Sequence, residues 1–295
     1  MATTQRAVST TSPAQRAPVG VDVGGTTTTA VRFEAGEHAV AAVAAAPTPQ
    51  GADAIVDIVG RLVADVADGA AVEPIGVGMP GRVDVTNGVV SLAVNLGITA
   101  PVEVAAMLAD RVGREVHVEN DVNAAALGAF VHLQRPPSSS LAYVNVGTGI
   151  AAGYVLEGRL WRGATGSAGE IGHVPMRHEG PACHCGQDGC AEAIGSGRAA
   201  RHGPRAKEGV LAATAWAVQL CAMALDVDVV VVGGGMTRPP GAFLQELLDV
   251  LAARASASPM LAALGLGGRV AVAPADVPLG NLGAALAAIH RQAVL

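Results

Sequence analysis

The chain has 295 residues, of which 51% are hydrophobic and 15% are charged, and its formal net charge at pH 7 is -6. This length and composition predict a globular protein with room for two modest domains. The negative charge argues against a nucleic-acid partner, and an aromatic content of 2% leaves little material for base-stacking surfaces.

The N-terminal residues 1–18 are polar, rich in Thr and Ser, and contain Pro. They hold no apolar run that could serve as a signal peptide or a membrane anchor, so we expect a disordered arm there. Farther along, no uninterrupted apolar run reaches the roughly 18 residues of a membrane span. The sequence therefore predicts a cytoplasmic protein without a membrane partner.

The first glycine-rich turn lies between two predicted strands, at residues 19–23 and 28–33. Its residues are Gly24, Gly25 and Thr26. The backbone N–H groups of such a turn can approach an anion closely, and Asp22 could hold magnesium directly or through water. An ordinary glycine hairpin has the same pattern, and the stretch lacks the lysine of a P-loop.

Helical and strand patterns follow in alternation. Apolar residues recur at helical spacing over residues 52–67, and residues 75–79 have the pattern of a buried strand. Residues 89–96 lead to Asn95, whose amide could bind a hydroxylated ligand, although a lone Asn is more often a turn residue. We expect a further helix over residues 102–112.

Asn120 and Asp121 lie where a predicted strand, residues 116–118, gives way to an alanine-rich helix, residues 123–130. The carboxyl end of a strand is a usual ligand-binding position in α/β sheets. Asp is also a preferred N-cap residue, so Asp121 could simply begin the helix. Sequence spacing leaves both interpretations open.

The Pro- and Ser-rich residues 134–140 precede a predicted strand at residues 141–146 and indicate the start of a second domain. A second turn follows, and then another strand at residues 150–156. That turn consists of Gly147, Thr148 and Gly149. The repeated pattern of strand, glycine–threonine turn and strand suggests an internal duplication that holds phosphates between its halves.

A possible metal site combines one imidazole with three thiolates, the ligand set of a closed tetrahedral zinc centre. Its candidate ligands are His173, Cys183, Cys185 and Cys190. Four protein ligands leave no position for a water, so the expected zinc is structural. Buried free cysteines, or one disulfide with a thiol left over, are the alternatives. Glu170 and Glu192 flank the cluster.

The last third begins with polar, basic residues 195–209, which predict a loop, and residues 210–225, which predict a helix holding the inert core thiol of Cys221. A buried strand at residues 229–232 then ends in Gly233, Gly234 and Gly235. These glycines could let a flat ligand approach the backbone, although a plain flexible loop has the same composition. The remaining predicted elements are a helix at residues 243–253, a strand at residues 270–273 and a helix at residues 283–292.

Taken in order, these motifs resemble those of the ROK family of bacterial sugar kinases (repressor, open reading frame, kinase) from residue 19 to the C-terminus. The motifs, each named by its first residue, are DVGGT at Asp22, GMPG at Gly78, ENDVNAAALG at Glu119, NVGTGI at Asn145, GEIGH at Gly169, CHCGQDGCAE at Cys183 and VVGGG at Val231.

The resemblance implies an actin-like, hexokinase-type fold of the ribonuclease H-like class, with two α/β domains and a cleft between them. It implies transfer of the γ-phosphoryl group of ATP to a hexose, with glucose 6-phosphate as the expected product. The expected divisions are the arm at residues 1–18, a small domain at residues 19–134, and a larger domain at residues 135–295 whose last helix could pack back on the small domain. A homodimer or homotetramer is also implied.

The resemblance also implies residue roles. Asp121 is the expected catalytic base, and Mg²⁺ would accompany ATP. The expected sugar-binding residues are Asn95, Asn120, Asp121, Glu170, His173 and Glu192. The expected nucleotide-binding residues are Asp22, Gly24, Gly25, Thr26, Gly147, Thr148, Gly149, Gly233, Gly234 and Gly235. His173, Cys183, Cys185 and Cys190 match the family's Zn²⁺ ligands, so one ring nitrogen of His173 would bind zinc while the other faces the sugar.

The chain departs from the family pattern at Thr27, at Ala129 and in a shortened segment at residues 197–229. That segment lies beside the expected nucleotide, so polyphosphate is an alternative donor. Another hexose or an N-acetylhexosamine is an alternative acceptor. A catalytically silent sugar sensor is a further alternative, whereas a DNA-binding repressor would need a helix-turn-helix domain before residue 19, which we do not expect.

Overall fold

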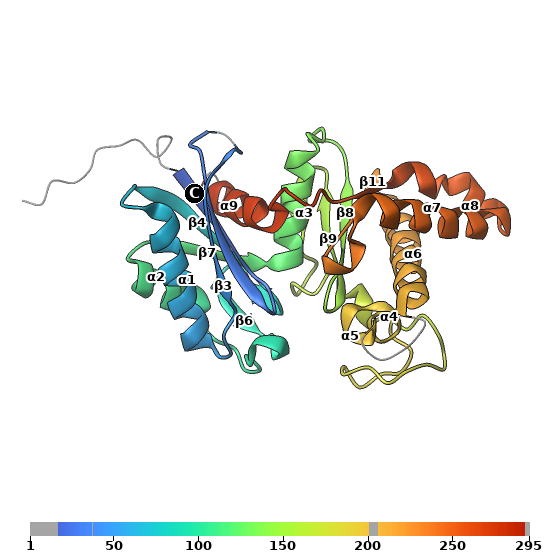
Figure 1. Ribbon diagram of the computed structural model, residues 1–295, viewed down its shortest axis with the longest axis horizontal. Helices are drawn as coiled ribbons and strands as arrows, with labels where there is room; N and C mark the ends of the chain where they lie inside the picture. The colour runs from blue at the N-terminus through green and yellow to red at the C-terminus, as the bar shows by residue number, and fades with distance from the viewer. Residues whose placement is uncertain (1–16, 37, 201–205, 293–295) are drawn as a thin grey trace, which may run out of the picture.

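The structure is a computed structural model that describes residues 17–36, 38–200 and 206–292. Two β-sheets lie side by side, with helices on their outer faces and a pair of helices between them (Figure 1). Residues 1–16 of the predicted disordered arm lie outside the described residues. The last two residues of that arm, Ala17 and Pro18, belong instead to the first strand.

The first sheet has the strand order β3-β2-β1-β4-β7 in the described part of the chain. β1 and β3 each pair with β2 in antiparallel fashion, and β4 pairs in parallel with β1 and β7. A small hairpin, β5 with β6, follows β4. These strands are β1 (Ala17–Val23), β2 (Thr27–Phe33), β3 (Val40–Pro47), β4 (Val72–Met79), β5 (Arg82–Asp84), β6 (Val89–Ser91) and β7 (Val116–Asn120).

The second sheet repeats this plan, with the order β10-β9-β8-β11-β12. Three strands form an antiparallel meander, and β11 pairs in parallel with β8 and β12. Its strands are β8 (Leu141–Val146), β9 (Ile150–Leu156), β10 (Arg159–Trp161), β11 (Val229–Gly233) and β12 (Val270–Val272). The internal duplication suggested by the two turns is therefore visible in the topology of the two sheets.

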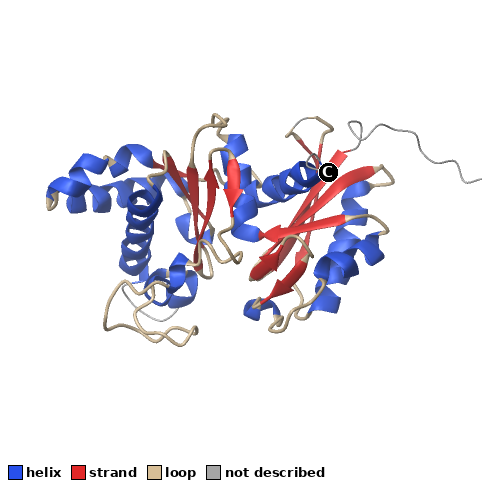
Figure 2. Cartoon of the chain, turned by 180° about the vertical axis from the view of Figure 1, so that it is seen from behind, coloured by secondary structure: helices blue, strands red, loops and turns tan. Residues whose placement is uncertain are grey.

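Helices on the outer faces bury the two main cores. α1 (Ala52–Ala67) and α2 (Val104–Val112) cover the first sheet, where Ile55 and Leu62 pack against its buried valines. α6 (Ala206–Leu225) and α7 (Pro240–Ser256) cover the second sheet (Figures 1 and 2). The shorter helices are α4 (Ala191–Gly195), α5 (Gly197–Ala200) and α8 (Pro259–Leu264), and the 3₁₀ turns are η2 (Val94–Leu96), η3 (Ile171–His173), η4 (Gly235–Thr237) and η5 (Leu266–Arg269).

Two helices cross between the sheets. α3 (Asp121–His132) follows the last strand of the first sheet but packs on β8 and β9 of the second, whereas α9 (Leu279–Gln292) packs on β1 and β4 of the first (Figure 1). They meet through Gly128 and Gly283, where a Cβ atom would collide with the backbone oxygens of Leu279 and Ala124. This close crossing joins the two halves directly behind the site described below.

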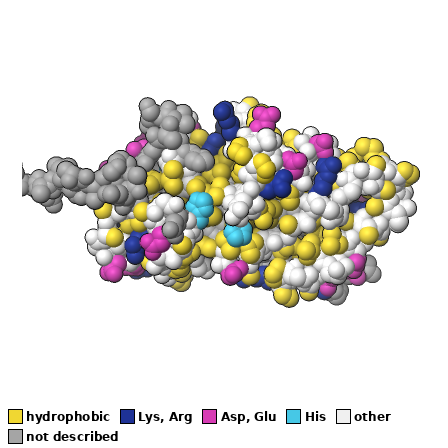
Figure 3. Space-filling model, turned by 90° about the horizontal axis from the view of Figure 1, so that it is seen from above, with side chains coloured by type: hydrophobic (Ala, Val, Ile, Leu, Met, Phe, Trp, Pro, Cys, Tyr) yellow, Lys and Arg dark blue, Asp and Glu magenta, His cyan; other side chains and the backbone are white. Residues whose placement is uncertain are grey.

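Charged side chains are sparse on the surface. On the face shown in Figure 3, Lys, Arg, Asp and Glu side chains are scattered among apolar and neutral atoms. Among the described helices, α6 meets the length and composition of a membrane-crossing segment over Lys207–Leu225, with a mean hydropathy of 1.4. Its buried Ala213, Val218 and Cys221 belong to the core under the second sheet, as in core helices of globular domains.

Several predicted elements need correction. The polar stretch 195–209 is not one loop, because α5 and the first turn of α6 form within it, and Lys207 and Glu208 are good helix formers. The helix expected over residues 102–112 begins at Val104. The sequence does not predict strand β3, because alanine fills much of it and has low strand propensity. Its structure depends instead on pairing with β2.

Candidate active site

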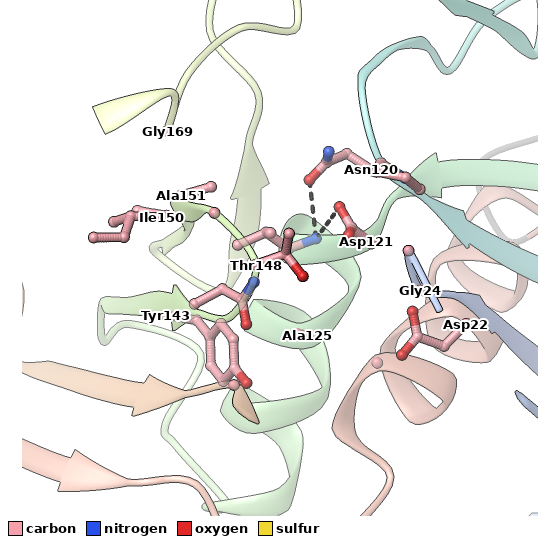
Figure 4. A pocket seen from close by; sticks show the side chains of 18 of the residues that line it. Asp22, Gly24, Asn120, Asp121, Ala125, Tyr143, Thr148, Ile150, Ala151 and Gly169 are labelled. Carbon is pink, nitrogen blue, oxygen red and sulfur yellow. Dashed lines mark hydrogen bonds between the residues drawn. The ribbon is translucent and has the colours of Figure 1, made fainter. Parts of the chain in front are cut away.

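A cavity of about 870 Å³ opens between the two sheets. Segments that follow β1, β4 and β7 in the first sheet, and β8, β11 and β12 in the second, line it. These are the carboxyl ends of the parallel strands, the edge at which α/β sheets usually bind ligands. Figure 4 shows the side chains that enter the cavity from both halves.

Asp121 is the first residue of α3, and its carboxylate faces the cavity (Figure 4). Its Oδ1 accepts a hydrogen bond from Val122 N at 3.0 Å. The N-cap is Asn120, not Asp121, because the Asn120 side chain accepts from the N–H groups of Val122 and Asn123. Burial, and then the negative charge of Asp22, raise the pKa of Asp121 to about 7. A carboxylate in this state can exchange a proton near neutral pH.

Asp22 approaches the same space from β1 (Figure 4). Burial raises its pKa to about 6. The first turn of α9 lies against it, since a Cβ atom on Gly280 would be 3.0 Å from Asp22 Oδ2. The N-terminal end of a helix favours an anion, so α9 partly offsets the cost of burying this carboxylate.

A buried ion pair supports the turn that carries Asn120 and Asp121. Glu119 is fully buried, and its Oε2 accepts from Arg162 Nη2 at 2.6 Å and from Arg162 Nε at 2.9 Å. Its Oε1 accepts from the Asn120 N–H at 2.9 Å and from Asn123 Nδ2 at 3.3 Å. Because Arg162 follows β10 of the second sheet, the pair ties the two halves together beside the cavity.

The predicted sugar-binding residues all line the cavity, and they come from both halves. Asn95, on the 3₁₀ turn η2, is exposed, and Asn120 keeps one amide hydrogen bonded to Gly81 O at 3.1 Å. Glu170 is exposed to the cavity, but the surrounding protein partly desolvates its carboxyl and raises its pKa, with His173 opposing and Glu192 adding to the shift. Glu192 is buried, and its Oε2 accepts from the Ile150 N–H at 3.0 Å.

The four predicted zinc ligands converge. The ligand atoms of His173, Cys183, Cys185 and Cys190 lie within 4.8 Å of one another. Cys183 Sγ is 3.6 Å from His173 Nδ1, and Cys185 Sγ is 3.7 Å from Cys190 Sγ. An edge of a tetrahedron with metal–sulfur bonds of about 2.3 Å is about 3.8 Å long. The cysteines are free thiols, so the disulfide alternative is wrong and the donor set fits zinc.

The glycine-rich turns contribute unequally to the cavity wall. The expected nucleotide-binding residues that line the cavity are Asp22, Gly24, Gly25, Thr148, Gly149, Gly234 and Gly235. Thr26, Gly147 and Gly233 lie outside the residues that line it. Gly147 accepts from the Gly197 N–H at 2.7 Å, and Thr26 accepts from the Thr48 N–H at 3.0 Å. Both carbonyls therefore hold neighbouring segments in place.

Sequence reasoning missed several residues at this site. His184 lines the cavity, and its Nδ1 lies 3.3 Å from Glu192 Oε1. Tyr143, Arg198 and Arg238 also line it, and Arg162 supports it through Glu119. His184 could have been noticed because it lies within the cysteine motif. The other four carry no local signal: Arg162 pairs with Glu119, 43 residues away, and the fold alone brings Tyr143, Arg198 and Arg238 to the cavity.

Known proteins are similar to this chain in sequence. A family model described as the ROK family matches residues 18–209. A glucokinase from Thermotoga maritima is 33% identical over 184 residues, which are 62% of this chain and 58% of that protein. An N-acetylmannosamine kinase from Vibrio cholerae is 32% identical over 185 residues, which are 55% of this chain and 64% of that protein. The chain thus spans less than two thirds of the length of these curated relatives.

The architecture matches a solved structure over nearly its whole length. A ROK family glucokinase from Streptomyces griseus, crystallised in complex with glucose and AMPPNP, is similar with a TM-score of 0.75 and 27% identity. The match covers 93% of this chain and 99% of that chain. The predicted two-domain, actin-like and hexokinase-type fold is therefore confirmed.

Proposed function

Because this chain belongs to the ROK family, we propose that it is a kinase that transfers the γ-phosphoryl group of ATP to a hexose, with glucose as acceptor and glucose 6-phosphate as product. The observation that carries the proposal is the Asp121 carboxylate, which faces a polar cavity between two domains and has a pKa raised to about 7. It can accept the proton of an attacking hydroxyl near neutral pH.

In the proposed reaction, the sugar oxygen forms a bond to the γ-phosphorus, and the bond from that phosphorus to the β–γ bridging oxygen breaks. The hydroxyl proton moves to Asp121, and ADP leaves. Phosphoryl transfer depends mainly on positioning and charge neutralisation. Val122 N–H and the capping side chain of Asn120 fix the first turn of α3, and so hold the Asp121 carboxylate in one place.

Recognition of the acceptor is assigned to Asn95, Asn120, Glu170, His173 and Glu192. A free sugar offers many hydroxyls and little apolar surface, so convergent carboxylates and amides are the groups that can distinguish it. Glu192 is held by the Ile150 N–H and by His184, which leaves its orientation fixed before a sugar arrives. A wrong epimer would leave such buried groups unpaired.

The donor is assigned to the part of the cavity lined by the two glycine turns, through Gly24 and Gly25 from the first half and Thr148 and Gly149 from the second. Asp22 would hold Mg²⁺, directly or through water, and the ion would neutralise charge on the donor phosphates. Burial of Asp22 suits this assignment, because a cation would relieve the cost of its negative charge.

Zn²⁺ is assigned to His173, Cys183, Cys185 and Cys190, whose separations match a tetrahedral sulfur and nitrogen site. Bound zinc would act as a structural cross-link. His173 would use Nδ1, the nitrogen that faces Cys183, and would leave Nε2 for a sugar hydroxyl. The cluster also fixes the segment that leads into α4 and Glu192.

The acceptor is the least constrained part of the proposal. Relatives include a glucokinase and an N-acetylmannosamine kinase, and mannose, fructose and N-acetylglucosamine are further candidates. Polyphosphate is the alternative donor. A cytoplasmic location and a homodimer or homotetramer remain predictions from the sequence and the family resemblance.

A coupled phosphorylation assay on purified, zinc-loaded protein tests the proposal. Each hexose or N-acetylhexosamine is paired with ATP or with polyphosphate, in the presence of magnesium. Turnover of glucose with ATP is expected. Turnover only with another sugar, or only with polyphosphate, would keep the reaction class and replace the substrate. Sugar binding without turnover by any pair would overturn the kinase assignment in favour of a silent sensor.

A further inference from the structure

Tyr143 is a polar residue of the cavity that no sequence motif identifies. It lies in the middle of β8, it is 6% exposed, and its side chain lines the cavity (Figure 4). In the part of the chain that the structure describes, its hydroxyl makes no hydrogen bond with another protein group, and the oxygen is not fully buried. Because the side chain lines the cavity, a molecule bound there could accept a hydrogen bond from this O–H.

Gly233 makes room for this hydroxyl. A Cβ atom at Gly233 would collide with Tyr143 Oη and would lie 2.6 Å from Tyr143 Cζ. Gly233 was predicted to approach a nucleotide, but it lies outside the residues that line the cavity. Its lack of a side chain instead lets the Tyr143 hydroxyl reach the carboxyl end of β11. The next two residues, Gly234 and Gly235, line the cavity and are expected nucleotide-binding residues.

Three charged residues influence the pKa of the Tyr143 hydroxyl. The charges of Asp22 and Asp121, from the first half, favour the protonated phenol, whereas the charge of Arg238, which follows η4, opposes them. Burial, and then both carboxylates, raise the pKa of Tyr143, so the phenol stays neutral and keeps its proton. The neutral O–H can donate to any hydrogen-bond acceptor in the cavity, and the proposed donor would supply phosphate oxygens there. Arg238, and Mg²⁺ held by Asp22, would offset the repulsion between such a phosphate and the two carboxylates.

We propose that the Tyr143 hydroxyl donates a hydrogen bond to a phosphate oxygen of the phosphoryl donor, as a donor-binding residue in addition to the glycine turns. This inference rests on the proposed function, because it takes phosphoryl transfer as the reaction. A neutral O–H donor adds affinity for phosphate without placing another buried charge between Asp22 and Asp121. Tyr143 thus complements Mg²⁺, which would neutralise the charge itself.

The test compares Y143F with wild type and with Y154F. Tyr154 is a matched control because it is also a buried tyrosine, on the neighbouring strand β9, and its hydroxyl faces Cys221 in the core. Binding of MgATP and MgADP is measured by calorimetry without sugar, and kcat/KM is measured by the coupled assay. For Y143F we expect MgATP affinity and kcat/KM for ATP to fall about 10-fold, the usual effect of a lost bond to a charged group.

Sugar affinity without nucleotide should stay unchanged in Y143F, and Y154F should match wild type in every donor measurement. Unchanged MgATP affinity and unchanged kcat/KM for ATP in Y143F would overturn the inference. An equal loss of glucose affinity would also overturn it, because that result would indicate a general disturbance of the cavity. If wild type binds MgATP but phosphorylates no sugar, the proposed function fails, and the binding comparison still decides the role of Tyr143.

Discussion

The two halves of the molecule share one strand order but present different residues at equivalent points. Asp22 stands two residues before the first glycine turn, and Asn145 stands two residues before the second. Two residues earlier in each strand, Gly20 corresponds to Tyr143. Gly20 leaves space for the backbone of α9, whereas Tyr143 fills the corresponding position and reaches into the cavity.

The two halves therefore share a backbone topology but contribute different functional groups to the cavity. The meander, the two added parallel strands and the crossing helix are common to both halves, and both glycine turns line the cavity. The acidic groups nearest the assigned reaction, Asp22 and Asp121, come from the first half. The second half contributes a phenol, an amide and the metal-binding segment. We infer that proton transfer belongs to the first half, and that both halves orient the substrates.

The largest expected effect comes from removing the proton acceptor of the first half. In D121N we expect kcat to fall roughly 1,000-fold, because general base catalysis contributes between about 10²- and 10⁴-fold. Glucose affinity, measured by calorimetry, should change little. D65N, at an exposed position of α1, serves as the control and should keep wild-type kcat. A D121N variant with normal turnover would transfer the role of base to another group.

The second prediction concerns the ion pair that joins the halves. Replacing Arg162 by Met leaves the Glu119 carboxylate buried without its cation, so R162M should lose about 3 kcal/mol of unfolding free energy. R162K should lose less, because it keeps a charge. The double variant E119Q/R162M should recover part of the loss, since it removes the stranded charge. Urea unfolding of wild type, E119Q, R162M and the double variant measures the coupling, and additive losses would show that the pair is not a unit.

Glu119 and Arg162 show which features of the structure the sequence can predict and which it cannot. Short apolar, β-branched runs and glycine turns predicted the central strands. The motifs predicted most of the named side chains that line the cavity, but Thr26, Gly147 and Gly233 lie outside its lining. Glu119 was noted only as the first letter of a motif. Its partner Arg162 lies 43 residues away and on the other sheet, so no local pattern indicates their contact. The same holds for Tyr143, whose neighbours Asp22 and Arg238 come from segments on either side of the cavity.

The third prediction concerns the metal-binding segment of the second half, from which the variant C190S removes one candidate ligand. C190S should lose its zinc, measured by atomic absorption, and its KM for sugar should rise roughly 10- to 100-fold because His173 and the segment before Glu192 are no longer held. The KM for ATP should change less. C221A is the control, because Cys221 is a buried thiol of α6 far from the cluster in sequence and in the core. Retention of zinc in C190S would exclude Cys190 as a ligand.

The fourth prediction has the smallest expected effect and replaces Asp22 by asparagine, the residue at the equivalent position of the second half (Asn145). D22N places the same residue before both glycine turns and removes a carboxylate whose pKa is raised from 3.8 to about 6. A raised pKa means that the folded state binds the proton more tightly. The resulting stabilisation is complete below about pH 4 and is lost as the pH rises through about 6. Wild type should therefore lose stability over this window, and D22N should lose less.

At pH 8 without magnesium, D22N should consequently exceed wild type in unfolding free energy by on the order of 1 kcal/mol, whereas at pH 4 the two should agree. Because the charge of Asp22 also raises the pKa of Asp121, the acidic limb of any remaining activity should move to lower pH in D22N. Urea unfolding at pH 4, 6 and 8 measures the first effect. A constant stability difference at the three pH values would mean that Asp22 is ionised as freely as an exposed carboxylate, and that the two halves differ there in hydrogen bonding rather than in charge.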